Sequence, residues 1–597
     1  MSLFDVLTML GGLALFLYGM ETMGDGLAKM AGGKLEKILE KLTSSTWKGV
    51  LLGLGVTAVI QSSSATTVMV VGFVNSGIMK LSQVVGIIMG ANIGTTVTSW
   101  ILSLASIQGS NVFLQLLKPS SFSPVLALIG IGMRMFSKDQ KKQDIGGIFL
   151  GFAVLMFGME TMTNAVAPLK DVPGFTSLLL MFSNPILGML AGAVITAVIQ
   201  SSSASVGILQ ALCMTGAVPY ATALPIIMGQ NIGTCVTALI SSIGASKNAK
   251  RASLIHLYFN IIGTVTFMVL FYAINLIHPF AFLHESAAAG GIAVIHSCFN
   301  IFATVMLFPF AQQLVKLATI SVKDGPTQEE EESQEDSDFM LLDSRFLETP
   351  AFAIEQCRNV TIRMAEEAQK SLQLAISLIH QYDPEKAAEV NRLENVVDRY
   401  EDELGSYLVK LSSRELTNYD SNTLSLLLHC IGDFERISDH AVNVEEAAKE
   451  MHEKKIGFSK KALEEMEIFS RALTDIVTCA FHAFENEDLQ EARQVEPREE
   501  VIDDLNDELK QRHIERLRRG KCTIEMGFIL SDITTSYERI ADHCSNIACD
   551  LIEIRQGGYE RHSYKEEVKS GENPEFIKDY QYYREQYVLP KSALTGN

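Results

Sequence analysis

Two short stretches place a glutamine and three consecutive serines inside strongly apolar sequence. They are "AVIQSSSAT" at residues 58–66 and "AVIQSSSAS" at residues 197–205. A serine run that opens a helix supplies unpaired backbone N–H groups and hydroxyl donors, and the helix dipole adds partial positive charge. We therefore predict an anion site that needs no positively charged side chain, although close packing of small residues is the alternative for either stretch alone. The candidate ligands are Gln61, Ser62, Ser63, Ser64, Gln200, Ser201, Ser202 and Ser203.

A second pair of motifs is rich in oxygen-bearing side chains: "GANIGTTVT" at 90–98 and "GQNIGTCVT" at 229–237. An unwound turn at these motifs would offer carbonyl and hydroxyl oxygens to a small, hard cation such as Na⁺. Hydrogen bonding between helices by Thr and Asn is the alternative. The candidate sodium ligands are Asn92, Thr95, Thr98, Gln230, Asn231, Thr234 and Thr237.

Charge compensation links the two kinds of site. Lys and Arg are missing from the middle of the apolar segments, and only Arg134 lies inside an apolar run, near its end. An anion held there without a counter-charge would be very costly in a low-dielectric site. We therefore expect the anion to bind well only when cations bind too.

Each "GMETM" segment carries one acid, Glu21 in the first and Glu160 in the second. An acid inside a membrane helix is a candidate for function. These two could bind a cation, carry a proton or hydrogen-bond a neighbouring segment. The pair "IHLYFN" (255–260) and "IHSCFN" (295–300) places His and Asn on one helical face, which indicates hydrogen bonds between helices.

The motifs recur because the first part of the chain is duplicated. A shift of 139 residues aligns "GLALFLYGMETM" (12–23) with "GFAVLMFGMETM" (151–162), and it also aligns both QSSS stretches and both GxNIGT motifs without a gap. Shared apolar composition cannot align three motifs at one offset. Internal repeats of this kind are typical of secondary transporters.

Segment length predicts how the QSSS stretches sit in a bilayer. The apolar piece 47–60 would span about 21 Å as a helix, which is short of the ~30 Å hydrocarbon core. We therefore predict re-entrant helical hairpins at 46–79 and 185–217. Full crossings are expected at 4–28, 83–107, 121–137, 144–165, 222–244, 252–278 and 288–318.

Positive charge predicts the orientation of these segments. With the N-terminus outside, thirteen Lys and Arg residues fall on the cytoplasmic side and two outside. Each repeat, at about 4–137 and 144–278, then has three crossings, so the second repeat is inverted and the two hairpins can meet at mid-membrane. The helix 288–318 completes this membrane transport domain, residues 1–323, which we place in a lipid bilayer.

The rest of the chain has a different character. Residues 1–323 carry a net charge of +7 and residues 324–597 carry −27, which sum to −20. No basic stripe is present, so nucleic acid is not an expected partner. We predict an acidic linker at 324–344, a soluble all-α domain at 345–557 made of two three-helix units, and an irregular tail at 558–597. Six helices are expected, at 350–382, 385–412, 420–451, 457–485, 488–518 and 522–557.

Acidic stripes repeat within the soluble domain. "FERISDHAVNVEE" (434–446) matches "YERIADHCSNIAC" (537–549), and "ENVVDRYEDEL" (394–404) matches "EEVIDDLNDEL" (499–509). Like charges at i,i+4 are mildly destabilising unless something neutralises them, and a metal ion would. A solvated face paired with Arg436 and Arg539 is the alternative. Carboxylate with imidazole suits Fe, Mn or Zn better than Ca. The candidate metal ligands are Glu394, Asp398, Glu435, Asp439, His440, Glu499, Asp503, Glu538, Asp542 and His543.

Residues 1–320 resemble the type II sodium–phosphate cotransporter family through the two QSSS motifs, each followed by a GxNIGT segment. Residues 345–555 resemble the PhoU family through the doubled E-R-I-x-D-H-x-x-N pattern. The resemblance implies a bacterial plasma-membrane protein that moves phosphate with Na⁺ by alternating access. It implies phosphate at the QSSS tips and sodium at Gln230, Thr234 and Thr237. It also implies multinuclear metal clusters at Glu435, Asp439, Glu538 and Asp542.

The leading hypothesis is therefore phosphate import coupled to Na⁺, with a regulatory, metal-binding cytoplasmic domain, and efflux is a variant of it. A Na⁺-coupled carboxylate or amino-acid carrier is an alternative, but the arginine clamp that such sites commonly recruit is not visible. A phosphate-sensing receptor without net transport is another. An enzyme is not expected, because the serines lack His and Asp partners and no Walker A motif occurs. A homo-oligomer or a phosphate-signalling partner of the cytoplasmic domain stays open.

Overall fold

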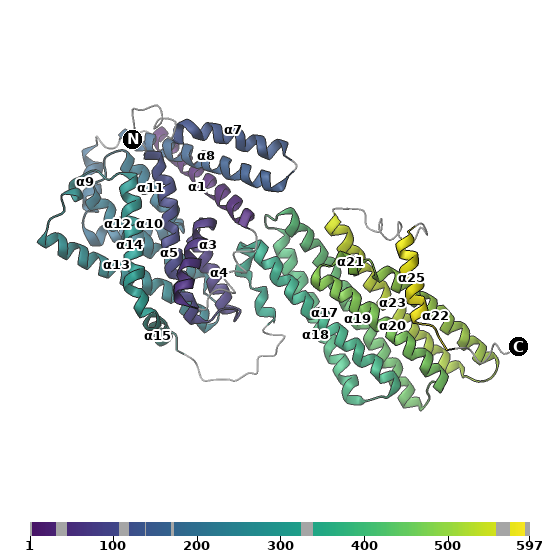
Figure 1. Cartoon of the computed structure of the whole chain (residues 1–597). Coiled ribbons are helices and arrows are strands. Elements are labelled where there is room, and N and C mark those ends of the chain that lie inside the picture. The colour runs from purple at the N-terminus through teal and green to yellow at the C-terminus, as the bar shows by residue number, and fades with distance from the viewer. Residues whose placement is uncertain are drawn as a thin grey trace. The chain divides into compact units, whose positions relative to one another are not determined.

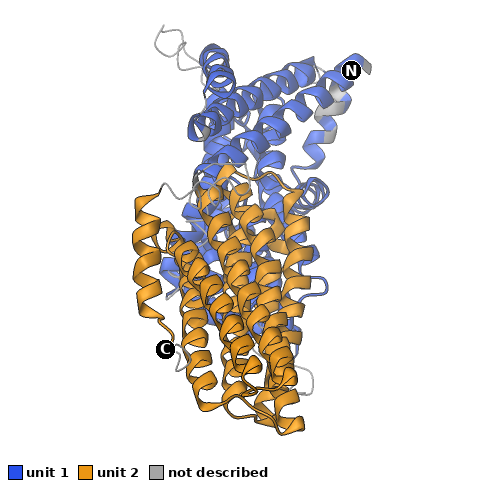
Figure 2. Cartoon of the chain, turned by 90° about the vertical axis from the view of Figure 1, so that its right-hand side faces the viewer, with its two compact units in different colours: residues 1–332 blue, residues 333–597 orange. Residues whose placement is uncertain are grey.

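The computed structural model describes residues 3–31, 45–106, 119–137, 139–168, 172–323, 338–556 and 573–590, and the regular elements in these ranges are helices. The chain divides into two compact units, Met1–Glu332 and Ser333–Asn597 (Figure 2). The all-α prediction is confirmed. The predicted acidic linker lies mostly outside the described residues, since 324–337 are not described.

The first unit contains the apolar helices (Figure 1). They are α1 (Leu3–Ala31), α3 (Thr46–Ile60), α4 (Ser63–Asn75), α5 (Leu81–Ser103), α7 (Pro119–Phe136), α8 (Gln140–Val166), α9 (Pro173–Met181), α10 (Pro185–Ile199), α11 (Ser202–Met214), α12 (Tyr220–Ser241), α13 (Lys247–Ile277), α14 (Ala289–Leu307) and α15 (Ala311–Ser321). Six stretches of the described residues are long and apolar enough to cross a membrane: α1, α5, α8, α12, α13, and α14 with α15.

Three details differ from the prediction. The predicted crossing at 121–137 is one of the shorter apolar helices, α7. The predicted single helix at 288–318 is interrupted by a 3₁₀ turn, Phe308–Phe310, where Pro309 cannot donate a backbone hydrogen bond. The short helix α9 was not predicted.

Both QSSS stretches form tight breaks between two helices. Gln61 ends α3 with φ = 60°, and Gln200 ends α10 with φ = 59°, so both glutamines have a left-handed backbone conformation. The following serine is extended and caps the next helix. This αL residue followed by an N-cap stops one short helix and starts another without a loop. The lengths and the breaks are those that the hairpin prediction requires.

Glycines set the distance between each hairpin and the helix after it. A Cβ at Gly94 would lie 2.7 Å from the carbonyl oxygen of Leu54, and one at Gly233 would lie 2.5 Å from that of Ala193. The two pairs are equivalent at the shift of 139 residues. The expectation of an unwound turn at the GxNIGT motifs is wrong, because α5 and α12 are continuous there. The glycines serve close backbone packing instead.

The equivalent helices α1 and α8 pack against each other in opposite directions. A Cβ at Gly12 would lie 3.1 Å from the carbonyl oxygen of Gly158, and one at Gly19 would lie 2.6 Å from that of Gly151. Gly12 corresponds to Gly151 and Gly19 to Gly158, so the contacts are exchanged between the two copies. Exchange of this kind requires a local two-fold relation between α1 and α8, which is the relation that an inverted repeat predicts.

The second unit is a set of long amphipathic helices (Figure 1). They are α17 (Pro350–His380), α18 (Pro384–Ser412), α19 (Asn418–Lys454), α20 (Lys460–Asn486), the short α21 (Leu489–Ala492), α22 (Val495–Arg518), α23 (Ile524–Gln556) and α25 (Pro574–Gln586). The first three and the group α20–α23 are the two predicted three-helix units. Phe434 packs at 4.9 Å from Phe481 and 5.2 Å from Phe484, ring centre to ring centre, so α19 and α20 share one core.

The prediction of an irregular tail is wrong for residues 574–586, which form α25. Asn573 caps this helix and Pro574 opens it. Tyr583 donates to Gln494 at 3.1 Å and lies 4.0 Å over the guanidinium of Arg498. Tyr580 and Tyr587 bond Asp504 and Asp475. Tyrosines at 580, 583 and 587 share one helical face, and this face packs on α22 and α20.

Candidate functional site

The two QSSS breaks have matching local geometry. The hydroxyl of Ser62 accepts from the backbone N–H of Ala65 at 3.1 Å, and that of Ser201 accepts from Ala204 at 3.2 Å. These two predicted ligands are therefore N-caps of α4 and α11. The next serines, Ser63 and Ser202, are the first residues of those helices and have 6 % and 5 % exposure. Their backbone N–H groups have no intrahelical acceptor and are available to an anion.

The structure brings the two breaks together. The hydroxyl of Ser64 donates a long hydrogen bond to the carbonyl oxygen of Gln200, with 3.5 Å between the two oxygen atoms. The first turn of α4 therefore meets the residue that precedes the start of α11. One predicted anion ligand from each repeat is therefore in contact, and anion binding by the whole set stays a prediction.

The two glutamines differ in their surroundings. Gln61 donates to the carbonyl oxygen of Ala58, and its Oε1 accepts from the hydroxyl of Thr98 at 2.8 Å. Thr98 was predicted to bind sodium, but here it holds a residue of the anion site. The equivalent threonine in the second repeat is Thr237, and its hydroxyl has no partner among the described residues.

The second repeat has two buried side-chain oxygens without a partner among the described residues, those of Thr237 and Gln230, and the first repeat has Ala91 at the position of Gln230. Gln230 donates to the hydroxyl of Ser205 at 2.9 Å, and its Oε1 is buried without a partner in the described part of the chain. Gln230, Thr234 and Thr237 follow the i, i+4, i+7 spacing and share one face of α12. This chemistry fits a hard monovalent cation.

Four of the predicted sodium ligands, Thr234 among them, donate hydrogen bonds to their own helices. Asn92 donates to Ile88, Asn231 to Ile227, Thr95 to Ala91 and Thr234 to Gln230, each at 2.8–3.0 Å. Their oxygens keep some acceptor capacity, but the side chains are already fixed. Glu21 and Glu160 lie on exposed sides of α1 and α8. The functional role of these two acids stays a prediction.

Three carboxyl groups of the first soluble bundle gather at one point. One carboxylate oxygen each from Glu394, Asp398 and Asp439 lies within 4.8 Å of the other two. Burial raises the pKa of Glu394 and of Asp398, and neighbouring carboxylates raise both further. Arg436 pairs with Asp439 at 3.2 Å and offsets part of this charge. The donor set fits a metal ion, because a divalent cation would relieve the remaining repulsion.

Glu435 and His440 lie beside this group. Burial, and then the charge of Asp439, raises the pKa of Glu435 to about 7. Burial and the neighbouring His543 lower the pKa of His440 to about 4, so its imidazole is neutral at physiological pH. A neutral imidazole is the form that binds metals.

The second acidic stripe is arranged differently. Glu538 accepts from Asn506 at 2.6 Å and lies 3.9 Å from the ammonium of Lys510. Arg539 pairs with Asp542 at 3.3 Å, and His543 bonds Asp433 at 2.8 Å. The described residues therefore do not bring Glu499, Asp503, Glu538 and Asp542 into a cluster like the first one. An amide and a cation already bond Glu538, and a cation already bonds Asp542.

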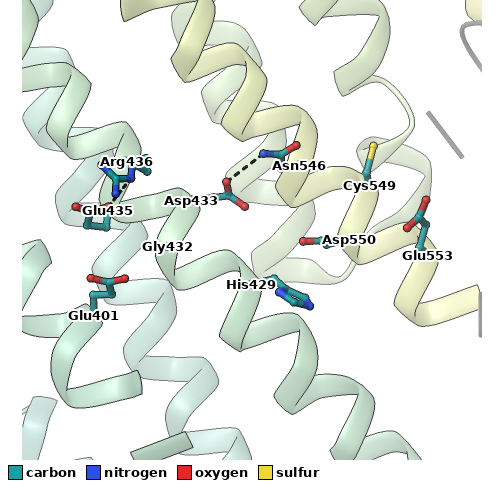
Figure 3. A pocket seen from close by; sticks show the side chains of 10 residues that line it. All are labelled: Glu401, His429, Gly432, Asp433, Glu435, Arg436, Asn546, Cys549, Asp550 and Glu553. Carbon is teal, nitrogen blue, oxygen red and sulfur yellow. Dashed lines mark hydrogen bonds and ion pairs between the residues drawn. The ribbon is translucent and has the colours of Figure 1, made fainter. Parts of the chain in front are cut away.

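A pocket of about 370 Å³ lies between α18, α19 and α23 (Figure 3). Figure 3 shows Asp433 reaching toward Asn546 from one side and Arg436 beside Glu435 on the other. Sequence reasoning missed this pocket. Asp433 sits two residues before the E-R-I-x-D-H-x-x-N pattern, and nothing in its spacing shows that it faces the other bundle. The residues that line the pocket are Glu401, His429, Gly432, Asp433, Glu435, Arg436, Asn546, Cys549, Asp550 and Glu553.

Comparison with known proteins matches each unit to a family. Residues 15–164 and 174–285 match the family described as Na⁺/Pi-cotransporter. Residues 361–448 and 467–551 match the PhoU domain. Each match falls on one of the two compact units and includes both repeats of that unit.

Three relatives show how far the similarity extends. YjbB of Salmonella typhimurium, named as an inorganic phosphate export protein, is 22% identical over 568 residues, which is 94% of this chain and 99% of that protein. YqeW of Bacillus subtilis is 30% identical over 249 residues, 42% of this chain and 76% of that protein. Sodium-dependent phosphate transport protein 2A of Rattus norvegicus is 38% identical over 106 residues, 17% of this chain and 16% of that protein. The chain therefore belongs to the Na⁺/Pi-cotransporter family and is a membrane protein that carries a PhoU domain on its C-terminal side.

Proposed function

We propose that the protein is a secondary active transporter that moves inorganic phosphate across the plasma membrane together with Na⁺, by alternating access. The observation that supports this most is the contact of Ser64 with Gln200, because it joins the two QSSS breaks. Helix starts that converge on one ion stabilise its charge with backbone N–H groups and hydroxyls. This arrangement suits a tetrahedral oxyanion that must also leave, since no charged side chain holds it permanently.

The repeats would be inverted across the bilayer. The opposite directions of α1 and α8 and their exchanged glycine contacts support this. The hairpins α3–α4 and α10–α11 would then enter from opposite faces, with the N-terminus outside and the PhoU domain in the cytoplasm. Alternating access would follow from movement of one repeat against the other around the fixed site.

Sodium would bind on α12. The unpartnered oxygens of Gln230 and Thr237 are the best-placed ligands, and Thr234 lies between them on the same face. A bound Na⁺ would offset the charge of phosphate, which otherwise pays the full desolvation cost of an anion in a low-dielectric site. Coupling would therefore be electrostatic.

The PhoU domain would regulate transport and bind a metal ion at Glu394, Asp398 and Asp439, with His440 and Glu435 beside them. Fe, Mn or Zn suits carboxylate and imidazole ligands. When bound, the metal would neutralise the carboxylates and hold α18 against α19. These helices supply the ligands, so metal loading would stiffen the first bundle.

Purified protein in liposomes tests the transport proposal. Radiolabelled phosphate should accumulate when an inward Na⁺ gradient is imposed and should not accumulate with K⁺ in its place. Equal uptake under both conditions would remove sodium coupling. Binding without accumulation would favour a receptor, and inhibition by succinate or aspartate would favour a carboxylate carrier.

Net export is a second candidate. YjbB, which aligns with nearly the whole of this chain, is named as a phosphate export protein. A coupled transporter runs in the direction that the sum of its gradients sets, so export and import need no different site. Liposomes loaded with phosphate and Na⁺ and diluted into Na⁺-free buffer should release phosphate faster than liposomes with Na⁺ on both sides.

A further inference from the structure

A buried group of hydrogen bonds joins three helices of the first unit and belongs to neither proposed ion site. Gln210 of α11 donates from Nε2 to the carbonyl oxygen of Ser99 on α5 at 3.1 Å. It also donates to the carbonyl oxygen of Ala289, the first residue of α14, at 3.0 Å. The hydroxyl of Ser99 shares a hydrogen bond of 2.8 Å with Nδ1 of His296 on α14. We call Ser99, Gln210 and His296 the Ser99 cluster.

The Ser99 cluster is not the arrangement that stability alone would favour. Its three side chains are at most 1 % exposed. Gln210 Oε1 and His296 Nε2 have no partner among the described residues. An unpaired polar atom costs desolvation free energy that an apolar side chain would avoid. Such a cost is expected where a specific geometry serves function.

The Ser99 cluster joins the two helices, α5 and α11, that hold the two QSSS breaks. Ser99 follows Thr98, whose hydroxyl holds Oε1 of Gln61 in the first break. Gln210 lies about two helical turns after Ser202, and Ser202 begins α11 in the second break. The cluster therefore fixes α5, which holds the first break, against α11, which carries the second. The two breaks touch each other between Ser64 and Gln200.

We infer that Ser99, Gln210 and His296 are positioning residues that keep the two breaks at the spacing phosphate requires. The inference rests on the proposed function, and none of the three residues touches phosphate. Loss of the cluster lowers the fraction of transporters that are competent to bind, and the apparent dissociation constant rises by the inverse of that fraction. Saturating phosphate restores the competent state, so the maximal rate is retained.

A purely structural role makes the opposite prediction. If the Ser99 cluster only stabilised the fold, its loss would reduce the amount of active protein. The maximal rate per milligram would fall, and the KM for phosphate would stay the same. The split between KM and maximal rate therefore distinguishes the two roles.

The chain offers a matched control. Trp100 donates to the hydroxyl of Ser297 at 3.0 Å, so this bond joins α5 and α14, as the bond between Ser99 and His296 does. The Trp100 bond is exposed and does not reach α11. Ser297→Ala should therefore leave the KM for phosphate unchanged.

The test is sodium-driven phosphate uptake by full-length protein in liposomes, normalised to the amount of monodisperse transporter. Gln210→Leu removes the two hydrogen bonds that join α11 to α5 and to α14. It should raise the KM for phosphate about fivefold to tenfold, the size expected for one lost hydrogen bond, with the maximal rate retained. His296→Leu breaks only the bond to Ser99 and should raise the KM by a smaller factor. His296→Asn should restore a KM near that of the wild type, because its amide can occupy the position of Nδ1.

The outcomes separate this inference from the proposed function. No uptake by the wild-type protein would overturn the proposed function. Wild-type uptake, with Gln210→Leu indistinguishable in KM from Ser297→Ala, would overturn the positioning role alone. If Gln210→Leu does not fold, the pair His296→Leu and His296→Asn decides, and equal KM values in that pair would also overturn the positioning role.

Discussion

The hydroxyl of Ser64 lies 3.5 Å from the carbonyl oxygen of Gln200, so two segments 136 residues apart in the sequence are in contact. Ser64 belongs to the first turn of α4, and Gln200 ends α10 in a left-handed conformation. The contact is long for a hydrogen bond and is therefore weak. A phosphate oxygen could replace the carbonyl as the acceptor for Ser64 at little cost.

The first prediction concerns the serines that begin α4 and α11. Ser63→Ala and Ser202→Ala should each raise the KM for phosphate roughly tenfold, because each removes a hydrogen bond to a charged ligand, worth about 1.5 kcal/mol. Sodium-driven uptake in liposomes measures the effect. Ser76→Ala is the control, since Ser76 bonds Gly72 at the far end of α4. Unchanged KM values in both tip variants would contradict the proposed anion site.

The second prediction separates capping from binding at Ser62. Ser62→Ala should destabilise the protein by about 1 kcal/mol, because Ala65 loses its cap. Ser62→Asn and Ser62→Asp both keep a capping oxygen and should restore the melting temperature. Only the aspartate adds a negative charge at the anion site, so it alone should weaken phosphate uptake. Equal uptake by the Asn and Asp variants would show that phosphate does not bind near this cap.

The third prediction concerns sodium. Thr237→Val removes a buried hydroxyl that has no partner among the described residues, so it should not destabilise the protein. It should raise the Na⁺ concentration needed for half-maximal uptake about fivefold, and Gln230→Ala should do the same. Thr98→Val is the matched control in the first repeat, because Thr98 already bonds Gln61. It should alter phosphate affinity rather than sodium affinity, and the opposite pattern would place the sodium site in the first repeat.

The sequence predicted the helices well because their signals are local. The repeat at a shift of 139 residues located both QSSS breaks, and the structure places α3, α4, α10 and α11 close to the expected ranges. The six helices predicted for the soluble domain follow the apolar periodicity of their sequences. These features depend on spacing along one segment, which the sequence contains in full.

Features that depend on pairing between segments were not predictable. The GxNIGT glycines look like ligand-exposing positions, but Gly94 and Gly233 serve contact with Leu54 and Ala193. The partners of these glycines lie about forty residues earlier, so the motif alone cannot reveal them. Thr98 was expected to bind sodium because its motif alone does not reveal its partner. Only the structure shows that its hydroxyl bonds Gln61.

The fourth prediction concerns the first acidic cluster. Asp398→Asn should raise the melting temperature of the metal-free protein, because removing one carboxylate relieves like-charge repulsion of about 0.5 kcal/mol. It should also abolish the further stabilisation that Mn²⁺, Fe²⁺ or Zn²⁺ gives the wild-type protein. Asp503→Asn, the equivalent change in the second bundle, should leave that stabilisation in place. Equal metal responses in all three proteins would exclude Glu394, Asp398 and Asp439 as the ligands.

The last prediction concerns the tail helix α25, which the sequence did not reveal. Tyr583 is 8 % exposed, whereas its neighbour Tyr582 is 64 % exposed. Tyr583→Ala removes packing on α22, the stacking on Arg498 and the bond to Gln494, and should destabilise the second unit by about 3 kcal/mol. Tyr582→Ala should change the melting temperature little, because its ring is solvated. Thermal unfolding of the full-length protein, followed for both variants, measures the difference. Equal melting temperatures would mean that α25 is not held on α22 in solution, and its tyrosine stripe would then need another partner.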